Sequence, residues 1–69
     1  MEHVLLQAAF MSSLRQMLVK FKKHDEELNQ QGRDVLGTCI MIRVANLREI
    51  GMKEHANEML EAFGWARAL

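Results

Sequence analysis

The side chains that could do chemistry are few and widely spaced in this chain. The three histidines are His3, His24 and His55, and none belongs to an HxxxH motif or to a pair of ExxH motifs. Those spacings bring metal ligands together on helices. His55 and Glu58 alone supply too few ligands. We therefore expect surface histidines, no metal site and no cofactor.

Nucleophiles and acid–base pairs are also missing from the pattern. The single cysteine, Cys39, has apolar neighbours, which disfavour a reactive thiolate, so we expect a structural thiol. Ser12 and Ser13 lie in no GxSxG motif. The acids at 25–27 follow a run of lysines, which is typical of a solvated helix face. The sequence predicts a protein without enzymatic activity.

The charges favour a protein partner over a nucleic acid. Nine basic and nine acidic residues give a formal net charge of zero, whereas nucleic-acid binders generally carry a basic surplus. A local basic patch with a flexible methionine beside it would suit an acidic protein surface. The predicted partner-binding residues are Arg15, Lys22, Met41, Arg43 and Arg48.

The elements that position these side chains depend on how the apolar window 35–47 folds. Its valines, isoleucines and threonine suit a strand as well as a helix. As a strand, its alternation does not separate apolar from polar residues. As a helix, it begins a four-and-three rhythm that runs from Thr38 to Phe63. A helix is therefore the better interpretation.

A turn divides the chain into two helices of similar length. Gly32 suits the C′ position after a first helix, and Asp34 suits the N-cap of a second. We expect one all-α domain folded as an antiparallel two-helix hairpin. Its parts are a helix over 2–31, a turn at 32–33, a helix over 34–63 and a tail at 64–69, with Gly64 as another C′ residue.

One apolar seam on each helix is expected to close the hairpin. In the first helix the seam is Val4, Met11, Leu14, Leu18, Phe21 and Leu28. In the second helix it is Thr38, Ile42, Ala45, Met52, Ala56, Met59 and Phe63. Large side chains would then face small ones, as they do in packed helices.

A second apolar seam remains on both helices and predicts a homodimer. A chain of 69 residues has a marginal core, and its one cysteine allows no intrachain disulfide to stabilise it. Because 49% of the residues are hydrophobic, a single hairpin would leave apolar surface uncovered. We expect two hairpins to associate into a four-helix arrangement. The predicted dimer interface is Phe10, Met17, Leu36, Ile40, Leu47 and Ile50.

Gly51 leaves a second chain path open. Glycine inside a helix costs about 1 kcal/mol relative to alanine, so the segment 49–55 can instead be a turn. The alternative is three helices near 2–31, 34–50 and 53–63, of which the last two resemble a helix-turn-helix. In both arrangements we expect the only tryptophan, Trp65, to clamp the end of the hairpin.

The sequence predicts neither a membrane span nor an export signal. Its apolar runs are far shorter than the roughly 20 residues that cross a bilayer, and its first residues lack a basic region. A lone thiol fits a reducing compartment, so we expect a cytoplasmic protein. The segment 4–23 is amphipathic like a membrane-surface helix, but its apolar face is needed in the two cores.

Apolar helical surface without any chemistry predicts a protein that binds other proteins. The chain resembles the secretion-system chaperone hairpin, which masks an aggregation-prone helix. It also resembles the short phage-encoded host-takeover proteins of the quorum-sensing anti-activator type, in its length and in its paired halves that meet at 29-NQQGRD-34. That resemblance implies an inhibitor that binds a LuxR-type transcriptional regulator and blocks DNA binding. A small helix-turn-helix DNA-binding protein is the remaining alternative.

Overall fold

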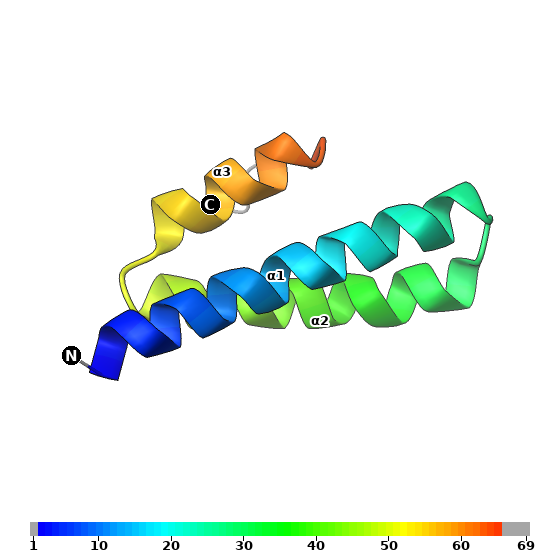
Figure 1. Cartoon of the computed structure of the whole chain (residues 1–69). Coiled ribbons are helices and arrows are strands. Elements are labelled where there is room, and N and C mark those ends of the chain that lie inside the picture. The colour runs from blue at the N-terminus through cyan, green and yellow to red at the C-terminus, as the bar shows by residue number, and fades with distance from the viewer. Residues whose placement is uncertain (1, 66–69) are drawn as a thin grey trace.

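The computed structural model describes residues 2–65, with side chains from residue 4 onward, and all regular structure in that range is helical (Figure 1). The elements are α1 (Glu2–Glu26), α2 (Gln30–Glu49) and α3 (Lys53–Ala62). α1 and α2 lie side by side and antiparallel, and α3 turns back along them in the direction of α1. None of these helices is both long and apolar enough to cross a membrane. The predicted all-α class is confirmed, with three helices in place of two.

The turn between α1 and α2 lies at 27–29, earlier than the predicted turn at 32–33. α1 ends in a Schellman motif, in which the N–H of Asn29 donates to the carbonyl of His24 (2.9 Å) and the N–H of Leu28 donates to that of Asp25 (3.1 Å). Leu28 takes the left-handed position that glycine usually fills, with φ of 58°. Because leucine gives no turn signal, the sequence pattern placed the turn at the nearest glycine instead.

Asn29 is the N-cap of α2, so the predicted cap at Asp34 and the predicted C′ role of Gly32 are corrected. The Asn29 Oδ1 accepts a hydrogen bond from the N–H of Gly32 at 3.0 Å, which places Gly32 in the first turn of α2. A Cβ at position 32 would lie 2.9 Å from ring atoms of His24. The glycine therefore allows the end of α1 to pack closely against the start of α2.

The hydrophobic core lies between the three helices. Its buried residues are Leu14 and Leu18 from α1, Ile40, Val44 and Leu47 from α2, and Ala56 and Leu60 from α3. Burying a leucine or isoleucine side chain contributes about 1.5–3 kcal/mol. Because α3 supplies part of this core, it is an integral element of the fold.

Gly51 ends α2 and starts the turn into α3. The N–H of Met52 donates to the carbonyl of Leu47 (2.8 Å) and the N–H of Gly51 to that of Arg48 (3.2 Å), which is a second Schellman motif. Gly51 has a φ of 81°, a conformation in which L side chains are strained. The continuous helix over 34–63 is therefore wrong, and the alternative with a break near Gly51 describes the chain path.

α3 ends in the same way at Gly64, as the sequence predicted. Gly64 has a φ of 82°, and the N–H of Trp65 donates to the carbonyl of Leu60 at 2.9 Å. This turn directs Trp65 back to α1, where its indole meets the ring of Phe21 edge to face, with centroids 4.9 Å apart. Trp65 thus holds the end of α3 against α1, the clamp expected from the sequence. The rest of the predicted tail, 66–69, lies outside the described residues.

Candidate functional site

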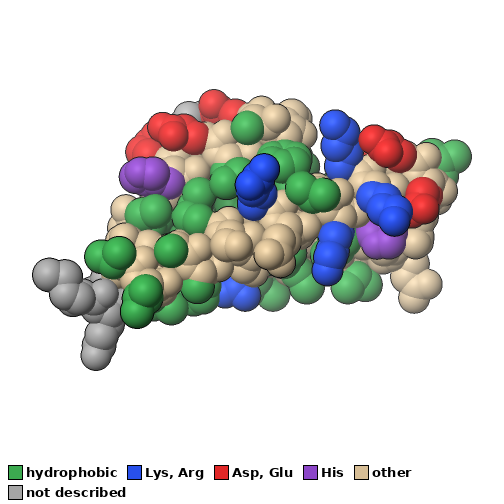
Figure 2. Space-filling view, in the orientation of Figure 1, with side chains coloured by type: hydrophobic (Ala, Val, Ile, Leu, Met, Phe, Trp, Pro, Cys, Tyr) green, Lys and Arg blue, Asp and Glu red, His purple; other side chains and the backbone are tan. Residues whose placement is uncertain are grey.

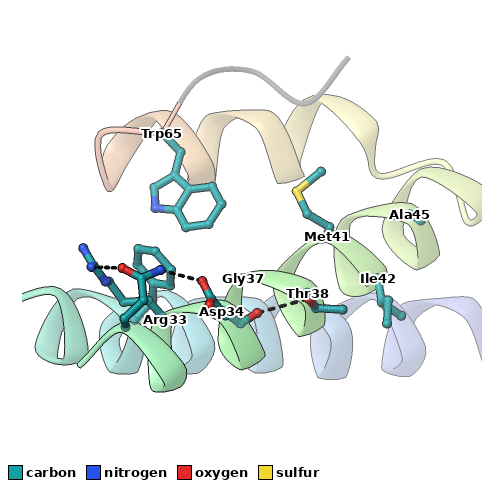
Figure 3. Close-up of a pocket in the computed structure, with 10 residues that line it drawn as sticks. Arg33, Asp34, Gly37, Thr38, Met41, Ile42, Ala45 and Trp65 are labelled. Carbon is teal, nitrogen blue, oxygen red and sulfur yellow. Dashed lines mark hydrogen bonds between the residues drawn. The ribbon is translucent and has the colours of Figure 1, made fainter. Parts of the chain in front are cut away.

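A shallow groove runs along the exposed side of α2. Its volume is about 800 Å³. One wall is α2, with Gly37, Met41 and Ala45 among its lining residues, and Trp65 projects from the end of α3 to form the other wall (Figure 3). Phe21 of α1 also lines it. Residues of α1 and α2 and the tryptophan that follows α3 therefore build this one concave surface.

The α2 wall exposes large apolar side chains to solvent. Met41 is 49% exposed and Ile42 is 57% exposed, and Val35, one turn or more away on the same helix, is 59% exposed. Large apolar side chains exposed on one helix of a small fold are a candidate interaction surface. It has no partner among residues 4–65, because the core uses the opposite side of α2.

Charged side chains border the groove at the start of α2. Arg33 donates to Asp25 at 2.7 Å and also to Gln30, and Gln30 in turn donates to Asp34 at 2.7 Å. The charge of Arg33 is therefore neutralised by Asp25. Asp34 has a hydrogen-bond partner but no cation within ion-pair distance in the described chain. The groove thus has an uncompensated negative charge at this end.

The structure buries part of the predicted dimer interface within the chain's own core. Ile40 and Leu47 are 0% exposed, and Phe10, Met17 and Ile50 pack against the same core. Leu36, the remaining member, is half-buried. Ile40 and Leu47 therefore cannot meet a second copy in the folded chain, and this part of the assignment is corrected. The other four side chains keep part of their surface exposed.

The seam expected to close the hairpin divides at Gly51. Before the break, Thr38 and Ile42 are exposed and Ala45 is half-buried, so this part faces outward into the groove. After the break, Ala56 is fully buried and Met52, Met59 and Phe63 pack on the core, so this part faces inward. The Gly51 turn reverses the chain, and residues that share a line on one continuous helix therefore face different ways.

The predicted partner-binding residues do not form one patch. Met41 lies in the groove, whereas Arg15 lines a separate hollow on α1 with Val19 and Lys20. Lys22 lines a third, near the end of α3. Arg48 is exposed on α2. At the end of the molecule where α1 meets α2, basic side chains lie next to acidic ones, so this surface does not carry charge of a single sign (Figure 2).

Arg43, the fifth predicted residue, has a role within the fold. Its guanidinium lies over the ring of Phe10, 4.5 Å from the centroid, and it donates to the Oδ1 of Asn46 at 3.4 Å. A cation over an aromatic face is attracted by the ring quadrupole. Arg43 therefore covers the side of the core between α1 and α2 and is not available to a partner in the way that Met41 is.

Residues that could do chemistry remain apart. No group of three or more His, Cys, Asp or Glu that could hold a metal ion lies together in the described residues. His24 contacts Glu27 (3.9 Å) and Asn29 (3.2 Å), and His55 is exposed. The side chain of His3 lies outside the described part. Cys39 is exposed, in contrast to the structural thiol expected from its neighbours.

Comparisons with known proteins add no relative to this picture. No family model matches the chain, and neither a curated protein nor a solved structure matches it. The groove is therefore characterised by its own geometry and chemistry.

Two groove residues had signals in the sequence that the periodicity did not use. Gly37 lies in the middle of α2, where a glycine is costly. Trp65 follows a C′ glycine, which turns the chain at the end of α3. Together, the glycine and the tryptophan indicate a face of α2 that a partner can approach closely, with an aromatic side chain beside it.

Proposed function

We propose that this protein is a non-enzymatic protein-binding inhibitor that docks the α2 groove on a helix of its target. The observation that carries the proposal is the apolar face of α2, on which Met41 and Ile42 are about half exposed beside Trp65. Apolar grooves between helices recognise amphipathic helices. A target helix held in this way is no longer available for its own contacts, which is inhibition by occlusion.

The chemistry of the groove defines the helix that it would accept. An apolar ridge with i, i+3, i+4 and i+7 spacing would fill the space over Gly37 and Ala45. Asp34 at one end favours a lysine or arginine at the corresponding end of that helix, because its negative charge has no cation in the described chain. The proposed ligand is therefore an amphipathic helix with a basic end.

The proposed target class comes from the resemblance to small anti-activator proteins. A LuxR-type transcriptional regulator, met in the cytoplasm, would lose access to DNA when the inhibitor covers a helix that its DNA-bound form needs. The second resemblance, to a secretion-type chaperone, would use the same groove for an aggregation-prone helix. Both share one physical step, the burial of a partner helix against α2.

Operator binding by a purified LuxR-type regulator tests the target class. Titration with the wild-type protein is expected to release the labelled operator, and Met41→Glu is expected to abolish the release because it places a charge in the apolar groove. Val19→Glu is a matched control, since Val19 is 52% exposed on α1, away from the groove. An operator complex that persists in excess wild-type protein would remove this class of target.

Homodimer formation stays part of the proposal, although the residues change. Ile40 and Leu47 of the predicted seam are fully buried, so we place the dimer contact on the exposed face of α2, where Met41 and Ile42 are about half exposed.

DNA binding has less support than protein binding. In a helix-turn-helix the second helix, here α3, would enter the major groove. The exposed residues of α3 include Glu54, Glu58 and Glu61, whose charges would repel phosphates. We therefore do not propose a nucleic acid as the ligand.

A further inference from the structure

Gly37 has no role in the packing of its own chain that requires a glycine. It lies in the middle of α2, where glycine costs about 1 kcal/mol relative to alanine. A Cβ at this position would make only an ordinary contact, 3.8 Å from Phe21 Cε2. Because Gly37 has no side chain, however, the backbone of α2 is accessible in the groove beside Met41. An external helix could therefore approach α2 closely at Gly37.

The same face of α2 carries two charges without counter-ions. Asp34 and Arg48 are both exposed and neither belongs to an ion pair in the described chain. They lie 14 residues apart, close to four helical turns, so they share one side of α2 at a separation of about 21 Å. Met41 lies midway between them.

We propose that a second copy of this chain docks on this face, with the two α2 helices antiparallel and Met41 at the two-fold axis. In this register Asp34 of each copy faces Arg48 of the other and Gly37 faces Ala45. The two Met41 side chains then meet at the axis, with a pair of small residues on either side. The interface is isologous, because one face supplies both the ridge and the groove.

The second copy occupies the groove proposed for the target helix. Self-association and target binding then exclude each other. This competition rests on the proposed function, but the dimer itself is independent of it. One helix face is small compared with the roughly 800 Å² per partner of a standard interface. The dimer is therefore expected to be weak and to release its groove to a target helix.

Charge reversal tests the register without any target. Asp34→Lys leaves only positive charges at the two ends of the face, and Arg48→Glu leaves only negative charges, so each variant repels itself. Each is expected to dimerise roughly tenfold or more weakly than wild type in sedimentation equilibrium. An equimolar mixture restores both pairs and is expected to form heterodimers, detected by native mass spectrometry. Glu26→Lys and Arg15→Glu, which change exposed charges of α1 that do not line the groove, are matched controls that keep wild-type dimerisation.

Trp65 reports whether the pairing covers the groove. It is the only tryptophan and lines the groove wall, so its quenching by acrylamide is expected to fall when the two charge variants are mixed. Three results would overturn the proposal: a wild-type monomer at hundreds of micromolar, single variants that dimerise like wild type, or heterodimers that leave quenching unchanged. Success here with no target found in any partner screen would refute the proposed inhibitor function alone.

Discussion

Trp65 and Phe21 meet edge to face, with ring centroids 4.9 Å apart and planes inclined by 68°. The contact joins the end of α3 to α1, and both rings also line the groove on α2. The same two side chains thus hold the end of α3 against α1 and shape the groove. Any change in how α3 is held must alter the groove as well.

Trp65→Ala is expected to lower the free energy of unfolding by about 2 kcal/mol, because it removes an aromatic pair and a half-buried indole. Urea denaturation followed by far-UV circular dichroism measures the loss. Val19→Ala, at a side chain that is 52% exposed, should change stability far less. Equal effects of the two substitutions would mean that Trp65 does not hold α3.

The sign of the stability change caused by Gly51→Ala distinguishes a turn at this residue from a continuous helix. Alanine in the middle of a helix would stabilise the protein by about 1 kcal/mol relative to glycine. At the φ of 81° found here it is expected to destabilise by about 1–2 kcal/mol instead, because L residues are strained in that region. Thermal or urea unfolding gives the sign, and a gain in stability would contradict the break.

Leu28→Gly is expected to stabilise the protein. Leu28 has a φ of 58° at the C′ position of α1, and its side chain is 80% exposed, so little packing is lost when it is removed. Relief of the left-handed strain is worth about 1 kcal/mol. The same substitution at Val35, 59% exposed inside α2, should destabilise, and a loss of stability at both sites would argue against the turn at 27–29.

Leu47→Ala and Ile42→Ala distinguish the inner from the outer side of α2. Leu47 is 0% exposed, so its truncation should cost about 2–5 kcal/mol. Ile42 is 57% exposed, and its truncation should cost well under 1 kcal/mol in the monomer. Denaturation is best measured at low protein concentration, where dimers do not contribute. Similar losses would show that the two sides of α2 are not divided in this way.

The sequence allowed the helical class, the apolar face of α1 around Leu14 and Leu18 and the C′ role of Gly64 to be predicted. It did not allow the two sides of α2 to be told apart. The rhythm that starts at Thr38 happens to continue in phase beyond Gly51, so periodicity alone could not detect the break. The local signal was Gly51 followed by an apolar residue, Met52, as in a Schellman motif.

The groove was beyond prediction for a related reason. It depends on α3 reversing direction at Gly51, which brings Trp65 next to residues of α2 far away in sequence. The first turn was misplaced because Leu28 takes a backbone conformation that its residue type does not indicate. In both cases a left-handed residue at a helix end decides which faces meet.

The central claim is that the α2 groove is a protein-binding surface. The most direct test compares the proteins that three immobilised baits retain from a cell lysate. These are the wild-type chain, Met41→Glu and Val19→Glu, with retained proteins quantified by mass spectrometry. The account predicts a partner other than the chain itself on wild type and on Val19→Glu, and its loss on Met41→Glu. Recovery of the chain alone, or of the same partner on all three baits, would contradict it.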